Sequence, residues 1–285
     1  AKSAKDKSIA KSAKDKSIAK SAKDKSIENH LGKYPIIPTT DGKLATIDNA
    51  KSVLAVSDDK KGNCLEQEVV EILESLTCPF LDESIIKDAF SVVIPLVADP
   101  RCVLDVLHVL DYMYSTEILD MSKFDEKRIN ILLSFFQTDC ENDKSMSIAK
   151  NLPFYKGVDE DYHSLSSYQS YIQVPPRLPD NVIKELQSLY YERKVLFLPV
   201  STNLNQLYAA LGIHVDFSAS QFYISYILPN FSSFTQECQI EFLAKIKDTN
   251  MTEELKERLK STRCIPDQSG NLRVASSYFS PYDEL

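Results

Sequence analysis

The chain has 285 residues, 43% of them hydrophobic, which is enough apolar material for one large core or two of ordinary size. It carries 41 acidic against 33 basic residues and a net charge of −8. This acidic balance argues against nucleic acid and against anionic membrane surfaces as partners. No run of residues approaches the roughly eighteen apolar side chains that a membrane-spanning helix needs.

Residues 1–28 differ from the rest of the chain. The nonapeptide AKSAKDKSI is repeated three times in succession up to Ile27. Its isoleucines recur every nine residues, so they alternate between opposite sides of a helix and form no apolar stripe. We interpret residues 1–28 as a solvated lysine-rich tail, being a tag, a linker or a segment of uncertain register, and not as a nucleic-acid-binding arm.

Two segments predict β-hairpins of the same design. YPIIPTTDGKLATIDNA (residues 34–50) and TRCIPDQSGNLRVASSYF (residues 262–279) each contain an Ile-Pro step, a turn with glycine, and a leucine at the same offset from the proline. Gly42 and Gly270 supply the positive φ that tight turns require, and proline is typical of a strand end. Looser versions of this pattern occupy residues 151–165 and 195–211. Such recurrence favours repeated packing units over a single catalytic centre.

The first half of the chain also contains helical patterns. Asn63 and Glu66 have the spacing of a capping box. The apolar residues that follow fall on one face of a helix: Leu65, Val69, Ile72, Leu73 and Leu76. Three further stretches are apolar on more than one side, and we expect them to form the core of this half: residues 84–98, 101–113 and 128–136.

The second half contains three more helical stripes. One follows Asp180 and includes Val182, Ile183, Leu186, Leu189 and Tyr190. Ser233 with Gln236 predicts the start of a helix that contains Cys238, Phe242, Leu243 and Ile246. Asn250 with Glu253 predicts the start of another, with Met251, Leu255 and Leu259.

These patterns predict an α+β fold, predominantly helical with small antiparallel hairpins and sheets, in which hairpin-plus-helix modules repeat. The polar segment 138–147 suggests a boundary near residue 150. We therefore expect a first lobe over residues 29–150 and a second lobe, with three hairpin-like segments, over residues 151–285. VPPRLPDN, residues 174–181, predicts a stiff joint because consecutive prolines favour an extended backbone.

Four phrases of the chain resemble the repeat regions of the sacsin family: YPIIPTTDGKL, LPFYKGVDEDYHSLSSYQSYI, KVLFLPV and CIPDQSGNLRVASSYFSPYDEL. The resemblance covers roughly residues 31–285. It implies a piece of a cytosolic chaperone-related protein that lies downstream of an ATP-binding domain like that of the ninety-kilodalton heat-shock chaperone. The implied partners are other repeats and ATP-binding domains of the same protein, client proteins, and the seventy-kilodalton heat-shock chaperone machinery.

The ATP-binding domain itself is not expected in this chain. Its phosphate-binding loops need clustered glycines, whereas the six glycines here are scattered. No nucleotide-binding residue is therefore carried over from the family, and no cofactor is expected.

Cysteine and histidine usage gives little sign of catalysis or metal binding. Six cysteines are scattered without a Cys-x-x-Cys pair, which favours a reducing compartment such as the cytoplasm, with most thiols buried. The four histidines are isolated: His30, His108, His163 and His214. We therefore assign no metal ligand and no catalytic residue. His163 lies near Asp159, Glu160 and Asp161 in an apparent acid–base cluster, although a solvated turn explains this group better.

Aromatic side chains gather in the second half of the chain. FYISYIL, residues 222–228, is the best candidate for an interaction surface if it proves exposed. The residues proposed for this surface are Phe222, Tyr223, Tyr226 and Phe231. The competing interpretation of the same residues is ordinary core packing.

Three functional hypotheses remain open. The leading one is a non-enzymatic scaffold and protein-interaction segment of a sacsin-like cytosolic chaperone, which positions ATP-binding modules and contacts clients. The second is a self-association module that pairs through exposed sheet edges. The third is an enzyme whose site assembles only in the fold, for example a hydrolase that uses Cys140 or His163 in a deep pocket.

Overall fold

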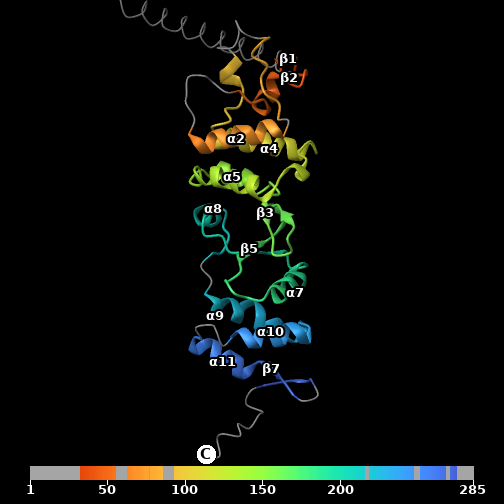
Figure 1. Cartoon of the computed structure of the whole chain (residues 1–285), viewed down its shortest axis with the longest axis vertical. Helices are drawn as coiled ribbons and strands as arrows, with labels where there is room; N and C mark the ends of the chain where they lie inside the picture. Colours follow the sequence, from red (N-terminus) through yellow and green to blue (C-terminus); the bar gives the residue numbers. More distant parts are fainter. Residues whose placement is uncertain are drawn as a thin grey trace, which may run out of the picture. The chain divides into compact units, whose positions relative to one another are not determined.

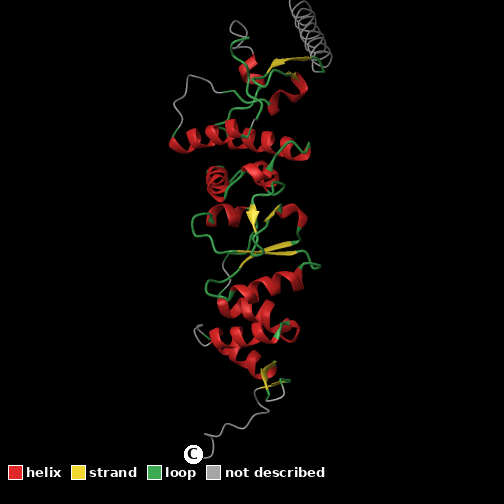
Figure 2. Cartoon of the chain, turned by 45° about the vertical axis from the view of Figure 1, so that its right-hand side comes forward, coloured by secondary structure: helices red, strands yellow, loops and turns green. Residues whose placement is uncertain are grey.

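The computed structural model describes residues 33–55, 63–76, 78–85, 93–215, 218–246, 251–267 and 270–274, so the lysine-rich tail lies outside the described part. The chain divides into two compact units, Ala1–Arg128 and Ile129–Leu285, rather than near residue 150. Helices provide most of the regular structure and the strands are short (Figures 1 and 2). The predominantly helical α+β fold is therefore confirmed, whereas the repetition of whole modules remains a prediction.

The first unit begins with a hairpin and continues with helices. Its elements are β1 (Pro35–Pro38), β2 (Leu44–Thr46), the 3₁₀ helix η1 (Ile47–Ser52), α2 (Cys64–Ser75), η2 (Ile94–Leu96), α4 (Val103–Ser115) and η3 (Met121–Lys123). Helix α5 (Glu126–Gln137) begins at the end of this unit and continues into the second. Ile37 of β1 is buried in a small cluster with residues that follow it: Ala50, Val53, Ala55, Leu81 and Val97.

The helix predictions for the first unit are largely confirmed. Helix α2 starts with the predicted capping box: the Asn63 side chain accepts a hydrogen bond from the Glu66 N–H, and the Glu66 carboxylate accepts one from the Asn63 N–H. Residues 101–113 and 128–136 form the buried helices α4 and α5. The prediction for residues 84–98 is confirmed only in part. The 3₁₀ helix there contains Pro95 and has no buried residue, whereas Val97 and Ala98 after it are buried and Val97 belongs to the core cluster of this unit.

The second unit alternates short strands with helices. Its elements after α5 are α6 (Asp143–Ala149), β3 (Tyr155–Lys156), β4 (Tyr162–His163), η4 (Leu165–Ser167), β5 (Ser170–Gln173), α7 (Asp180–Tyr190), β6 (Val195–Leu198), α8 (Asn205–Ala210), α9 (Ala219–Phe222), the π-helical turn η5 (Tyr223–Ile227), η6 (Leu228–Ser233), α10 (Gln236–Ile246), α11 (Glu253–Ser261), β7 (Arg263–Pro266) and β8 (Leu272–Val274). One large apolar cluster joins α7, β6, η5, α10 and α11.

The hairpin predicted at residues 195–211 is wrong. Strand β6 pairs in parallel with β5, and α7 connects the two as a crossover helix. All four residues of β6 are buried, as is typical of a parallel strand. Gln187 of α7 bonds the backbone of β6, since its side-chain amide donates to the Val195 carbonyl (3.0 Å) and accepts from the Phe197 N–H (2.8 Å). The proline-rich joint at residues 174–181 connects β5 to α7 inside this unit.

Two predicted helix caps are also corrected. Helix α10 is capped by Thr235, whose hydroxyl accepts from the Cys238 N–H (3.4 Å), whereas Ser233 ends the preceding 3₁₀ helix. Helix α11 is capped by Thr252, whose hydroxyl accepts from the Leu255 N–H (3.2 Å). A threonine hydroxyl satisfies the first-turn donor in each case. Asn250 lies outside the described residues.

The three antiparallel hairpins share one turn geometry. The N–H of the residue before the three-residue loop donates to the carbonyl of the residue after it, in Thr39 to Lys43 (3.0 Å), Gly157 to Asp161 (2.8 Å) and Asp267 to Asn271 (2.9 Å). The residue before that acceptor is left-handed in every case, with φ of 76° at Gly42, 72° at Glu160 and 81° at Gly270. This is the three-residue hairpin loop that normally requires glycine at its last position. The hairpins predicted at residues 34–50, 151–165 and 262–279 are therefore confirmed.

Hairpins β1–β2 and β7–β8 also match in strand register. Pro38 pairs with Leu44 as Pro266 pairs with Leu272, and each first strand has an irregularity at the residue after its first pair. The irregular residues are Ile36 and Cys264, which therefore occupy equivalent positions. The match in sequence spacing thus reflects a match in backbone structure.

Candidate functional site

The aromatic interaction surface predicted in the second unit is not on the surface. Phe222, Tyr223 and Phe231 are buried, and Tyr226 is half-buried. Their rings pack edge to face or tilted against one another and against the core, with centroids 5.2 Å apart for Phe222 and Tyr226 and 5.0 Å apart for Tyr223 and Phe242. The run from residue 222 to 228 is apolar on all sides, and a helical segment of that kind is enclosed by its neighbours. The prediction is therefore wrong, and the core interpretation holds for these residues.

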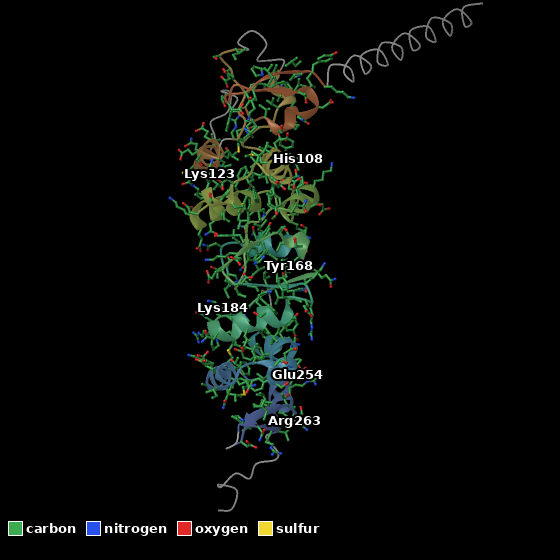
Figure 3. All side chains as sticks on the ribbon, turned by 90° about the vertical axis from the view of Figure 1, so that its right-hand side faces the viewer. His108, Lys123, Tyr168, Lys184, Glu254 and Arg263 are labelled. Carbon is green, nitrogen blue, oxygen red and sulfur yellow. The ribbon has the colours of Figure 1, made fainter. Side chains whose placement is uncertain are left out.

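The cluster around His163 is assembled by the β3–β4 hairpin. His163 Nε2 lies 2.9 Å from Asp159 Oδ1, and the Tyr168 hydroxyl lies 3.0 Å from His163 Nδ1. The His163 and Tyr168 rings meet edge to face with centroids 5.5 Å apart, and Tyr168 is labelled in Figure 3. Burial raises the pKa of the Tyr168 phenol. Asp159, His163 and Tyr168 are thus half-buried, whereas Glu160 and Asp161 are exposed, so the solvated turn expected at this position describes only those two residues.

We interpret this cluster as a structural brace, a set of hydrogen bonds that stabilises the β3–β4 hairpin. Both ring nitrogens of His163 are engaged, one by a carboxylate of the turn and the other by the Tyr168 hydroxyl. Neither nitrogen is directed at Cys140, the other residue of the enzyme hypothesis, which is half-buried. Gly157 permits the arrangement, because its missing side chain leaves room for Asp159 and His163 to meet.

The cysteines and histidines outside this cluster do not converge on a reactive site. Cys78, Cys238 and Cys264 are buried, whereas Cys64 and Cys102 are exposed. Burial raises the pKa of the Cys78 thiol to about 12, and its Sγ lies 3.4 Å from the Met113 sulfur. His108 is exposed on α4, His214 is exposed beside β5, and His30 lies outside the described residues.

Among the described residues, no group of three or more histidine, cysteine or acidic side chains is placed to hold a metal ion. No helix in the described part of the chain has both the length and the apolar character needed to cross a bilayer.

The first unit contains an apolar groove with a volume of about 420 Å³. One side is formed by Leu44 and Ala45 of β2, and the other by Tyr112 and Met113 near the end of α4, with Ile118 beyond that end. Leu44 and Ile118 are 56% and 57% exposed, so large apolar side chains at the groove face solvent. This is the strongest candidate for a functional surface in the first unit.

The end of α4 places Ile118 at the groove. The Ile118 N–H donates to the Met113 carbonyl (2.8 Å), and Glu117 has a left-handed φ of 58°. This is a Schellman-type helix end, in which the left-handed residue reverses the chain and is usually glycine. Because Glu117 occupies that position, no glycine marks the helix end in the sequence. The sequence therefore did not predict the groove.

The polar end of the groove neutralises its own charge. The Thr39 hydroxyl donates to the Asp41 carboxylate, and Lys43 Nζ lies 2.9 Å from the same carboxylate. The hydrogen bond from Thr39, followed by that from Lys43, lowers the pKa of Asp41. The paired charges leave the groove suited to an apolar segment of another polypeptide and poorly suited to a free ion.

Comparisons with known proteins give no match: no protein-family model, no curated protein and no solved structure matches the chain.

Proposed function

We propose that this chain is a non-enzymatic scaffold and protein-interaction segment of a sacsin-like cytosolic chaperone, and that it binds an apolar polypeptide segment in the groove of the first unit. The observation that carries the proposal is the groove itself, with its solvent-facing Leu44, Tyr112 and Ile118. In such a chaperone the segment would position ATP-binding domains and contact neighbouring repeats, clients and the seventy-kilodalton chaperone machinery. Free cysteines in a chain of this size fit a reducing cytoplasm.

The size of the groove indicates weak and reversible binding. A fully buried aliphatic or aromatic side chain contributes about 1.5–3 kcal/mol, and the groove side chains are already half-covered. Covering three of them contributes on the order of 3 kcal/mol, from which the cost of ordering the bound segment must be subtracted. A dissociation constant of several millimolar or weaker is therefore expected for a short segment, as suits a chaperone that must release its clients.

Titration of the full chain with a permanently unfolded protein, reduced and carboxymethylated α-lactalbumin, tests the groove. We expect Ile118→Asp to weaken binding at least fivefold, because a carboxylate at the groove resists desolvation. Ile85→Asp is the matched control, since Ile85 is 68% exposed in the same unit and does not line the groove. Equal binding by wild-type chain and Ile118→Asp would refute the groove as the binding surface. Submicromolar ATP binding in calorimetry would refute the non-enzymatic scaffold.

Self-association is a second candidate, favoured by the exposed apolar side chains of Tyr34 and Ile36 at the first hairpin. It predicts that light scattering of the full chain shows a mass that rises with concentration and that Ile36→Asp returns the mass to that of a monomer. A strictly monomeric wild-type chain would exclude this function.

A further inference from the structure

Strands β5 and β6 belong to a small parallel sheet that includes a third stretch of chain at residue 214. Strand β5 pairs in parallel with β6, and its Ile172 also forms a parallel bridge with His214. The Gln173 N–H donates to the His214 carbonyl (3.0 Å), and the His214 N–H donates to the Tyr171 carbonyl (3.0 Å). Strand β5 is therefore central, with β6 on one side and residue 214 on the other.

The order in which the chain visits these strands reverses at β5. The chain leaves β5, crosses through α7 to β6, and then crosses through α8 to residue 214 on the opposite side of β5. Helices α7 and α8 accordingly lie on opposite sides of β5 in Figure 1. In parallel sheets of this design, ligands bind in the crevice outside the carboxyl ends of the strands, where the strand order reverses. The carboxyl end of β5 is therefore the place to expect a binding site.

A cavity of about 270 Å³ lies at that end of the sheet. Its walls come from the residues that end or follow each of the three strands. Gln173 ends β5, Pro175 and Pro176 follow it, Val200 and Thr202 follow β6, and Val215 follows His214. The cavity thus lies where the topology places a ligand.

Gln173 supplies this cavity with a free hydrogen-bond acceptor. The residue is 7% exposed, and its Nε2 lies 3.4 Å from the carbonyl oxygens of Pro199 and Ser201. Two carbonyl oxygens attract the amide N–H and repel the amide oxygen, so Oε1 points away from them. Oε1 has no partner among the described residues. Each fully buried side-chain oxygen or nitrogen in the described part of the chain does have one, so Oε1 opens to the cavity that Gln173 lines.

The loop after β5 argues against phosphate as the bound group. In nucleotide-binding sheets, backbone N–H groups of the loop after the first strand hold the phosphate. Pro175 and Pro176 have no backbone N–H, so the corresponding loop here lacks those donors. None of the described residues that line the cavity carries a charge. The ligand should therefore be uncharged and should carry a hydrogen-bond donor.

We propose that this cavity binds a small neutral molecule with a primary carboxamide on an apolar ring. The carboxamide N–H donates to Gln173 Oε1, and its carbonyl accepts from the side-chain amide of Asn205, which lines the same cavity. Valine and proline side chains cover the ring. Because the volume is just below the roughly 300–1,000 Å³ of sites for drug-sized ligands, a single ring is the expected size. This site is independent of the proposed function of the groove.

Benzamide and N,N-dimethylbenzamide are matched probes, because both are neutral and only the first has N–H donors. In ¹H–¹⁵N spectra of the full chain, we expect benzamide to shift the amide signals of residues 171–174, 200–205 and 213–215 saturably, with a dissociation constant of about a millimolar. N,N-dimethylbenzamide should bind at least fivefold more weakly, because it leaves Oε1 unpaired. Absence of saturable shifts at these residues would overturn the proposal and leave water as the occupant. Equal affinities of the two probes would also overturn it, since apolar contact alone would then explain binding.

Gln173→Met removes the acceptor with little change in side-chain length. We expect this variant to bind both probes equally, at the weak affinity that N,N-dimethylbenzamide has for the wild-type chain. Gln239→Met is the matched control, because Gln239 is also buried, its Nε2 also donates to two backbone carbonyls, and it does not line the cavity. This control should keep the fivefold preference for benzamide. A Gln173→Met chain with the same preference would overturn the proposal, and if circular dichroism shows that this variant does not fold, the two probes on the wild-type chain decide alone.

Discussion

Replacing Gly157 by alanine tests whether the His163 cluster braces the β3–β4 hairpin. A Cβ at this position would lie 2.3 Å from Asp159 Oδ1 and 2.9 Å from His163 Nε2, which is far inside contact distance. Gly157 is not left-handed, so the alanine backbone is unstrained. Both obstructing atoms belong to side chains, which will rotate away and give up the Asp159–His163 and His163–Tyr168 hydrogen bonds.

The expected cost follows from those two bonds. Each contributes about 1 kcal/mol to the free energy of unfolding. Alanine restricts the unfolded chain more than glycine does, which offsets about 0.5 kcal/mol. Gly157→Ala should therefore lower the free energy of unfolding by about 1.5 kcal/mol in urea titrations of the full chain, followed by circular dichroism.

A double-mutant cycle with His163→Ala identifies the mechanism. Without the imidazole, neither hydrogen bond remains to be lost, so the cost of Gly157→Ala should fall to about zero or become a gain of up to about 0.5 kcal/mol. Asp159 can then turn toward solvent and gives up only the long hydrogen bond that its Oδ1 accepts from the Asp161 N–H (3.3 Å). An equal cost of Gly157→Ala in the two backgrounds, within about 0.3 kcal/mol, would refute the brace and point to an effect on the backbone alone.

Three further predictions concern the turns and the thiols. Gly42→Ala should destabilise the first unit by about 1 kcal/mol, because no atom lies within 4 Å of the added Cβ and only the left-handed φ of 76° resists it. Glu160→Gly should instead stabilise the β3–β4 hairpin, whereas Glu160→Gln, which removes the charge but not the strain, should not; equal effects of the two would contradict this account. In iodoacetamide labelling read by mass spectrometry, Cys64 and Cys102 should react in the native chain. The buried cysteines should react only after unfolding: Cys78, Cys238 and Cys264.

Local turn chemistry explains which hairpins could be predicted from sequence. Gly42 and Gly270 identify left-handed positions directly, because other residues pay a steric cost there. Glu160 takes the same conformation without that signal and is joined to Lys156 by an exposed ion pair of 2.9 Å. The β3–β4 hairpin could therefore be predicted only because its sequence resembles the two hairpins that have glycine at the left-handed position.

The sequence-based predictions fail where contacts with distant parts of the chain determine the structure. Strand β6 resembles the first strand of a hairpin because Pro199 follows it, yet its four consecutive apolar residues and the helix before it indicate a buried parallel strand. The aromatic run at residues 222–228 shows the same limit, because sequence cannot tell an apolar surface from an apolar interior. The groove depends on the helix end at Glu117 and on the approach of β2 to α4, neither of which has a local signature.

The same turn occurs in hairpins β1–β2, β3–β4 and β7–β8, and comparing what covers each copy helps to decide whether the first hairpin is a binding surface. If the turn served only to reverse the chain, the residues around each copy should show no consistent pattern of cover. All three copies are fastened: β3–β4 through His163 and through the backbone bond from Val158 to Phe197 (3.0 Å), and β7–β8 through Cys264 and Leu272. Hairpin β1–β2 is held by the buried Ile37 and by the backbone bond from Thr40 to Phe80 (2.8 Å), so it differs from the others in the exposure of Ile36 and Leu44. Exposed apolar side chains at equivalent positions of β1–β2 therefore depart from the chain's own pattern. A partner segment is the simplest physical reason for leucine and isoleucine at those positions.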